Sequence, residues 1–195
     1  IINQTDRLTS LVNNILGPNK KPSFELQNIH APLESVLGLL QQDLSESGID
    51  LIKDYDPSIP EISIDNYLLE QSILNLVKNA KESLEEGEVF SPEIRIVTRV
   101  LRKEFLGQTQ HKTVCSISVA DNGPGIPKDL KDSIFFPMIS SKATGSGLGL
   151  SITQGIISQH NGIIKCESEP GKTEFSILIP IKHQVHDQES RRANA

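Results

Sequence analysis

Several features that would point to particular classes of protein are scarce in this chain. Among its 195 residues there are two cysteines and no tryptophan, and aromatic residues make up 4%. Cys115 and Cys166 both stand in apolar, strand-like runs. This indicates reduced core residues in a cytosolic protein rather than a disulfide framework, although the sequence leaves a single bridge between them open. The missing tryptophan excludes nothing by itself.

Positive charge is also scarce, because 19 Lys and Arg face 25 Asp and Glu, for a net charge of −6. A general nucleic-acid surface would need a basic excess, so we expect no direct nucleic-acid partner. The longest apolar runs fall far short of a membrane span, and no signal-peptide pattern opens the chain. We therefore expect a cytoplasmic protein with no membrane segment in this chain, built around one sizeable core.

Proline and glycine divide the chain into segments. Residues 1–16 carry apolar side chains at helical spacing, and Gly17 and Pro18 end the expected helix. No capping residue stands at its start, and its apolar side has no partner within the segment. It looks like the end of a longer helix. The expected divisions are the end of a helical domain at 1–17, a linker at 18–23, the main domain at 24–181 and a polar, disordered tail at 182–195.

Hydrophobic periodicity predicts a mixture of strands and helices in the main domain. The expected strands are 24–26, 49–55, 94–102, 113–120 and a terminal hairpin that turns at Pro170 and Gly171, with a polar loop between 102 and 113. The expected helices are 28–45 with Asn28 as its cap, a strongly periodic helix that starts at Asp65 or Asn66, and 148–160. Because these elements do not alternate as βαβ units, we predict an α+β fold. It is a two-layer sandwich with helices on one face of a mixed, mostly antiparallel sheet.

Two asparagines mark the polar side of the helix at 66–84. Asn75 and Asn79 are one turn apart, opposite the apolar side, and Lys78 lies beside them. Asparagine is a poor residue for the middle of a helix, so a pair of them indicates a use for their amides. An amide oxygen is a suitable neutral ligand for Mg²⁺, which takes its other ligands from water and phosphates. A solvated helix face is the alternative interpretation.

The stretch DNGPGIP at 121–127 directly follows a predicted strand. A buried carboxylate at a strand end, here Asp121, can accept a hydrogen bond from the exocyclic amine of adenine, where guanine presents a carbonyl. Gly123 and Gly125 lack the Cβ atoms that would hold a flat ring away. The alternative is a Gly/Pro turn that carries a surface aspartate.

A third stretch, SSKATGSGLGLSI at 140–152, leads into the last predicted helix. Its glycines are Gly145, Gly147 and Gly149. The N-terminus of a helix offers unpaired N–H groups and the positive end of the helix dipole, which suits phosphates. The spacing is neither a Walker loop nor a Rossmann fingerprint. We expect residues 140–144 to form a lid over the nucleotide, the alternative being a flexible loop with a capping glycine.

Together these stretches resemble the ATP-binding domain of sensor histidine kinases, in the superfamily shared with type II topoisomerases, the Hsp90 chaperone and MutL. The resemblance covers nearly all of 24–181 and implies a Bergerat-type ATP-binding fold. Its parts are EQSILNLVKNA (70–80) as the N box, DNGPGIP as the G1 box, FFPM (135–138) as the F box, GSGLGL (145–150) as the G2 box and GKTEF (171–175) as the final strand. The lid departs from the family, which usually has an arginine and extra glycines there.

Two further stretches, QNIHAPLESVL at 27–37 and KDYDPSIPEI at 53–62, are similar to nitrogen-regulation sensor kinases of the NtrB type. In that family residues 1–17 would end the dimerisation and phosphotransfer domain. The resemblance implies ATP and Mg²⁺ as cofactors. The implied partners are a response regulator of the NtrC type, a PII-type signal protein and a second copy in a full-length homodimer.

The same resemblance implies roles for individual residues. Asp121 would bind the adenine amine with help from Gly125 and Thr173, and Asn79 would be the metal ligand for Mg²⁺. The implied nucleotide-binding residues are Asn75, Lys78, Asn79, Asp121, Gly123, Gly125, Ile126, Phe136, Ser141, Lys142, Gly145, Gly147, Leu148, Gly149, Leu150 and Thr173. No catalytic residue is expected in this chain, because the phosphoacceptor histidine is absent and γ-phosphoryl transfer needs positioning and charge neutralisation more than covalent chemistry from this domain.

The phosphoryl acceptor in such kinases is a histidine in a helix motif that occurs nowhere in this sequence. His30 in HAPL has the wrong spacing for that motif and is expected only to open a helix. Two alternative functions stay open. A hydrolase of the same fold is disfavoured because Asn75 stands where hydrolases carry a glutamate base. A nucleotide-gated docking module without catalysis is the other.

Overall fold

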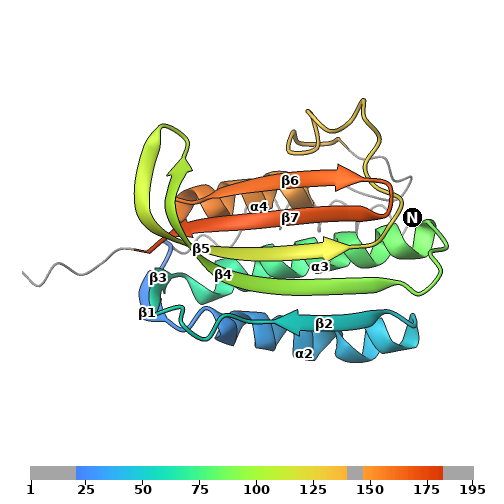
Figure 1. Cartoon of the computed structure of the whole chain (residues 1–195), viewed down its shortest axis with the longest axis horizontal. Helices are drawn as coiled ribbons and strands as arrows, with labels where there is room; N and C mark the ends of the chain where they lie inside the picture. The colour runs from blue at the N-terminus through green and yellow to red at the C-terminus, as the bar shows by residue number, and fades with distance from the viewer. Residues whose placement is uncertain (1–20, 140–146, 182–195) are drawn as a thin grey trace, which may run out of the picture.

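The computed structural model describes residues 21–139 and 147–181. The expected helix at 1–16, the start of the linker, the lid at 140–144 and the tail at 182–195 lie outside these residues. Within the described part, the chain forms a layer of three helices against a five-stranded sheet, with a separate two-stranded sheet at one end (Figure 1). This arrangement confirms the predicted two-layer sandwich.

The large sheet has the strand order β2-β4-β5-β7-β6. Only β2 and β4 are parallel in it, and the other neighbours are antiparallel, so the sheet is mixed and mostly antiparallel as predicted. Its strands are β2 (Asp50–Asp54), β4 (Glu93–Leu106), β5 (Thr109–Asp121), β6 (Ile163–Glu169) and β7 (Lys172–Pro180). The small sheet pairs β1 (Glu25–Gln27) with β3 (Ile62–Ile64).

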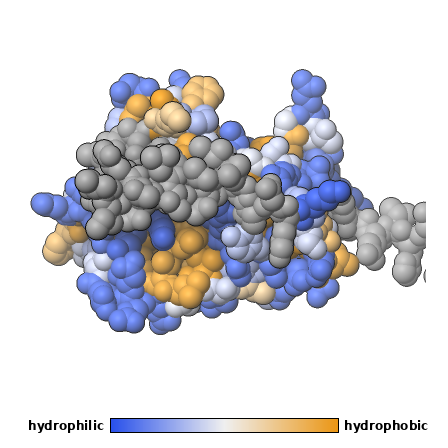
Figure 2. Space-filling view, turned by 180° about the vertical axis from the view of Figure 1, so that it is seen from behind, coloured by the Kyte–Doolittle hydropathy of each residue, from blue (hydrophilic) through white to orange (hydrophobic). Residues whose placement is uncertain are grey.

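The helices α2 (His30–Glu46), α3 (Asn66–Glu86) and α4 (Gly149–Gln159) all lie on one face of the sheet (Figure 1). Burial of each Leu or Ile side chain stabilises the fold by about 1.5–3 kcal/mol. Seen from behind, much of the visible surface is hydrophilic, with one larger apolar area and several smaller ones (Figure 2). In α3 the buried apolar positions are those that the periodicity predicted: Leu69, Ile73, Leu76, Val77, Ala80 and Leu84.

Hydrogen bonds join the start of α3 to the end of α4. Asp65 is the N-cap of α3, and its side chain accepts the N–H of Leu68 at 3.0 Å and that of Ser23 at 2.8 Å. The backbone N–H of Asp65 in turn donates to Nε2 of the buried His160, the C-cap of α4, at 3.1 Å. These bonds fix the start of α3 against the end of α4.

The hairpin of β4 and β5 is longer than predicted. The segment between 102 and 113, expected to be a polar loop, continues both strands to a turn at Gly107, whose φ is +64°. Its polar composition misled because this part of the hairpin projects beyond the helices (Figure 1), and most of its side chains are exposed or partly exposed. Leu106 at its end is anchored by packing against Val114 and Leu178.

Two smaller predictions are also corrected. The strand β3 was missed because three residues are too few to show a period of two. Asn28 is not the cap of α2, which begins at His30 with Ile29 at the N-cap position. The Asn28 Oδ1 atom instead accepts the backbone N–H of His30 at 2.9 Å.

Both cysteines are free, as predicted; Cys115 belongs to the buried core, whereas Cys166 is partly buried and packs against it. Desolvation raises the pKa of the buried Cys115 thiol to about 12 and that of the partly buried Cys166 thiol to about 11. No helix in the described part of the chain combines the length and apolar character that crossing a membrane requires.

Candidate functional site

A cavity of about 290 Å³ opens between α3, the start of α4 and the ends of β5 and β7. Its lining comes from α3 with Asn75 and Asn79, from the DNGPGIP loop and from the glycine-rich segment before α4, which are far apart in the sequence. The predicted site residues that line it are Asn75, Lys78, Asn79, Asp121, Gly125, Ile126, Gly147, Gly149, Leu150 and Thr173. The fold therefore gathers most of the predicted residues around one space.

Some predicted residues do not line this cavity. Gly123 lies behind the Asp121 carboxylate, Leu148 is buried at the N-cap of α4, and the Phe136 side chain is 62% exposed. Ser141, Lys142 and Gly145 lie outside the described residues.

Asp121 is the last residue of β5, and its side chain is buried with 6% exposure although it lines the cavity. Its Oδ1 atom accepts the backbone N–H of Gly123 at 2.9 Å. A carboxylate held this way presents a fixed acceptor to the cavity in a region with little competing water. Such an acceptor can bind an amine donor and disfavour a carbonyl in the same place.

The two glycines of DNGPGIP serve a different purpose from the one predicted. A Cβ on Gly123 would lie 2.6 Å from Oδ1 of Asp121, and a Cβ on Gly125 would lie 2.8 Å from the carbonyl oxygen of Glu169. Gly125 also has a φ of +85°, which favours glycine. These contacts face the protein, so the glycines allow the loop to pack against Asp121 and the turn after β6 rather than clearing room for a ring.

The two asparagines of α3 line the same cavity as Asp121. The Asn75 Nδ2 atom donates to the carbonyl of Gly149 at 3.3 Å and to Oγ1 of Thr153 at 3.4 Å. Asn75 thus ties α3 to the first turn of α4, which the sequence did not indicate. Asn79, one turn further along α3, shares the wall with Lys78.

The start of α4 forms another side of the cavity. Its N-cap residue Leu148 makes no side-chain capping bond, and Gly147 and Gly149 on either side line the cavity. Gly147 has a φ of +66°, and a Cβ there would lie 2.7 Å from the backbone of Met138. Backbone N–H groups of a first helical turn without a side-chain cap suit an anion such as a phosphate.

Sequence reasoning missed part of the lining: Ala80, Glu82, Ser83, Pro127, Leu130, Ile134, Ile139, Ile152 and Phe175. Two of these carried a usable signal. Glu82 continues the helix face of Asn75 and Asn79, and Phe175 follows Thr173 at the strand period of two. Leu130 and Ile134 come from irregular backbone and carried no such signal.

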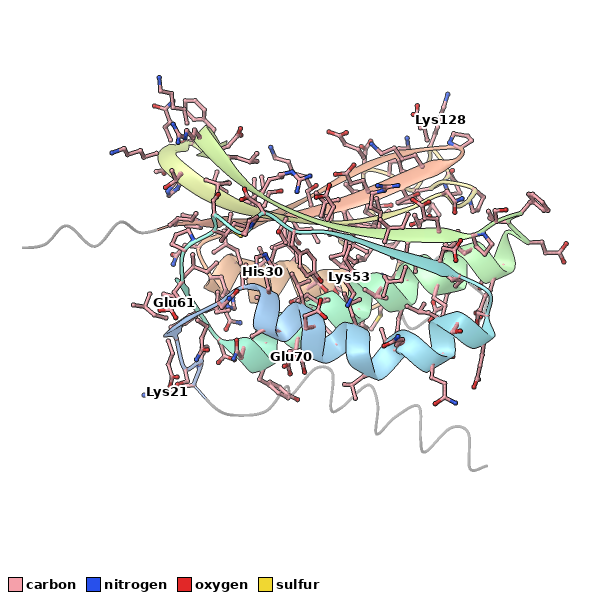
Figure 3. The ribbon with its side chains drawn as sticks, turned by 60° about the horizontal axis from the view of Figure 1, so that its bottom comes forward. Lys21, His30, Lys53, Glu61, Glu70 and Lys128 are labelled. Atoms are coloured by element: carbon pink, nitrogen blue, oxygen red, sulfur yellow. The ribbon has the colours of Figure 1, made fainter. Side chains whose placement is uncertain are left out.

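His30 lies outside the cavity lining, at the start of α2 (Figure 3). Its ring stacks on Tyr55 with the centroids 4.8 Å apart, and its Nε2 atom lies 3.0 Å from Oγ1 of Thr98. Burial lowers the pKa of His30, while Asp56 and Glu34 act against this shift. The contacts agree with its prediction as a residue that opens a helix.

Comparison with known proteins identifies the class of protein. Residues 64–183 match the family described as histidine kinase-, DNA gyrase B-, and HSP90-like ATPase. The chain belongs to this family, whose members use ATP. The chain is also similar to the sensory histidine kinase/phosphatase NtrB of Vibrio alginolyticus, with 44% identity over 181 residues that cover 93% of this chain and 51% of that protein. It therefore spans about half the length of the curated relatives it matches.

Solved structures give the same result. ShkA in complex with AMPPNP matches with a TM-score of 0.73 and 26% identity over 92% of this chain and 37% of that one. The histidine kinase ThkA in complex with the response regulator protein TrrA matches with a TM-score of 0.72 and 27% identity over 93% of this chain and 49% of that one. The sequence resemblance to histidine kinase ATP-binding domains is confirmed.

Proposed function

We propose that this chain is the ATP-binding catalytic part of a sensor histidine kinase of the NtrB type. It positions ATP so that the γ-phosphoryl group passes to a histidine on a dimerisation helix. Nothing in this chain matches the acceptor motif, so the acceptor would stand on another segment. The observation that carries the proposal is the buried Asp121 carboxylate, which faces the same cavity as the amides of Asn75 and Asn79 and the start of α4.

Each wall of the cavity has a part in holding the nucleotide. Asp121 accepts the adenine amine, with Thr173 beside it on the neighbouring strand. The apolar side chains of Ile126 and Phe175 cover the base, and Phe135 supports Phe175 edge-on at 6.4 Å between ring centroids. The first turn of α4 and Lys78 lie where they can take the phosphates.

Mg²⁺ fits the donors that the cavity offers. Asn79 supplies a neutral amide oxygen on the wall shared with Lys78, which suits a cation whose other ligands are water and phosphate oxygens. We assign Asn79 as the protein ligand. ATP with Mg²⁺ supplies the transferable phosphoryl group, and the chain contributes alignment and charge neutralisation.

Transfer is supported over hydrolysis by the chemistry of Asn75. A water-activating base must take a proton, which a carboxamide cannot do, and the Nδ2 atom of Asn75 is engaged with α4. The whole protein then includes residues 1–17 as the end of a dimerisation and phosphotransfer domain, 18–23 as a linker and 182–195 as a tail. It acts in the cytoplasm as a homodimer with an NtrC-type response regulator and a PII-type signal protein. The likeness to NtrB and to ThkA in complex with the response regulator protein TrrA supports a response regulator as a partner.

Calorimetric titration of the chain with non-hydrolysable ATP and GTP analogues, with and without Mg²⁺, tests the binding. We expect the ATP analogue to bind and the GTP analogue not to bind. A purified acceptor domain of an NtrB relative, added with radiolabelled ATP, tests the transfer and should become labelled. A folded chain that binds neither nucleotide would overturn the proposal and favour the alternative function, a docking module without catalysis. Binding with release of phosphate but no labelling would favour a hydrolase.

A further inference from the structure

Ser168, the residue before the end of β6, joins three segments next to the cavity. Its Oγ atom accepts the backbone N–H of Ile126 in the DNGPGIP loop at 2.8 Å. The same atom lies 3.0 Å from Oγ1 of Thr173 on β7. Its backbone carbonyl accepts the Lys131 ammonium from the following loop. Ser168 does not line the cavity, so any effect on a ligand passes through Thr173 and the loop.

The hydrogen bonds at Ser168 allow an arrangement in which the Thr173 hydroxyl is a donor towards the cavity. A serine hydroxyl has one proton to donate, and Oγ of Ser168 already accepts a bond from Ile126. In the described part of the chain, Thr173 is the partner available to take the Ser168 proton. When Ser168 donates to Oγ1 of Thr173, that oxygen is the acceptor in the bond. The proton of the Thr173 hydroxyl is then not used in the bond and can be donated to another group. The Thr173 hydroxyl then acts as a donor.

Thr173 can use that proton on a ligand because of its position. It is 4% exposed, it lines the cavity, and it pairs with Asp121 across β7 and β5. The cavity therefore offers an acceptor, the Asp121 carboxylate, next to a donor, the Thr173 hydroxyl. Adenine has the complementary pair at its edge, an amine donor beside the ring nitrogen N1, which is an acceptor. Guanine and hypoxanthine invert both positions, with a carbonyl oxygen beside an N1–H.

We propose that Ser168 is a positioning residue for base selection, which fixes Thr173 as a donor and thereby makes the site read the N1 position of adenine. This inference rests on the proposed nucleotide site. It adds a second selective contact to the one made by Asp121. It also assigns this contact to a residue that does not touch the ligand.

The backbone around Ser168 is well suited to hold this arrangement. The N–H of Gly171 in the β6–β7 turn donates to the carbonyl of Gly123 at 2.9 Å. Gly125 packs so closely on Glu169 that no Cβ fits between them. Loop and hairpin therefore stay together through bonds that do not involve the Ser168 side chain. Loss of the hydroxyl should change the direction of Thr173 more than the position of the loop.

The test is calorimetric titration of wild type, Ser168→Ala, Ser168→Thr and Ser176→Ala with three ligands. The ligands are the imido analogues of ATP, of purine riboside triphosphate, which keeps N1 but lacks the amine, and of inosine triphosphate. Ser176→Ala is a matched control, because Ser176 also makes a Ser hydroxyl pair, with Ser118 at 2.8 Å, but neither residue lines the cavity.

We expect Ser168→Ala to weaken binding of the ATP and purine riboside analogues by the same factor, roughly five- to tenfold. Binding of the inosine analogue should stay unchanged or improve, because a freed Thr173 hydroxyl can turn to accept its N1–H. Ser168→Thr keeps the hydroxyl, so its affinities for the three analogues should stand in the same ratios as those of the wild type.

Other outcomes separate the two proposals. Equal weakening of all three ligands in Ser168→Ala would mean that Ser168 only supports the loop, and would overturn the inference while leaving the nucleotide site intact. Wild type that binds none of the three would overturn the proposed function itself. Circular dichroism and thermal unfolding of each variant check that it is folded.

Discussion

Asp121 and Thr173 are paired residues on the adjacent antiparallel strands β5 and β7, and both are buried at the same edge of one cavity. The pairing places an anionic acceptor and a hydroxyl within one base-binding edge. The backbone of each residue is placed by a strand inside the sheet, because β5 and β7 both have neighbouring strands on either side. The geometry of this edge is therefore set by the sheet itself.

Asp121→Asn should lower the affinity for an ATP analogue by roughly 10- to 100-fold. The variant keeps an oxygen that can accept the Gly123 N–H, so the loop should stay folded. It replaces the other acceptor oxygen with an NH₂ group, which repels the adenine amine and can donate to the carbonyl of hypoxanthine. Titration with ATP and inosine triphosphate analogues should therefore show the preference between the bases shrinking or reversing. A variant that binds ATP as wild type does would exclude Asp121 as the base acceptor.

Asn79→Ala should remove most of the Mg²⁺ dependence of nucleotide binding, because the amide oxygen that would ligate the ion is lost. Titrations with an ATP analogue at zero and millimolar Mg²⁺ measure this dependence. Gln71→Ala, on the same helix but outside the cavity lining, is the control and should keep it. If Asn79→Ala still binds ATP more tightly with Mg²⁺ than without, another group holds the metal.

Gly125→Ala should destabilise the fold by about 1–3 kcal/mol, because it puts a Cβ at positive φ and 2.8 Å from the carbonyl oxygen of Glu169. Gly38→Ala is the matched control. Gly38 lies inside α2, and a Cβ added there would meet no atom within 4 Å, so alanine should stabilise the fold by about 0.5–1 kcal/mol. Urea unfolding at neutral pH measures both free energies. Equal effects at the two positions would contradict the role assigned to the close packing at Gly125.

His30→Gln should flatten the pH dependence of stability in mildly acidic solution. Burial lowers the pKa of His30 in the folded chain from its ordinary value of 6.5. The unfolded chain therefore takes up a proton first as the pH falls through about 6.5, and the folded state loses stability there. Above that pH neither state is protonated at His30, so the loss disappears. Urea unfolding at pH 7, 6 and 5 gives the slope of the unfolding free energy against pH for the wild type and for the variant. Identical slopes would rule out this contribution of His30.

The sequence by itself determined the class of fold and about half of the residues that line the candidate site. The period of 3.6 residues in α3 located its buried face because a helix on a sheet buries one side only. The motifs at Asp121, Asn79 and Gly149 could be identified because their chemistry requires particular residue types at short, fixed spacings along the chain.

Only the tertiary structure decided which surfaces these residues meet. The glycines of DNGPGIP were expected to make room for a ring, yet their Cβ directions face Asp121 and the turn at Glu169. The polar segment beyond Arg102 became strand because its partner lies across a long hairpin. Ser168 carried no signal in the sequence, since its hydroxyl gains a purpose only from Ile126 and Thr173. Contacts of this kind join segments that the chain brings together on folding, and local periodicity contains no information about them.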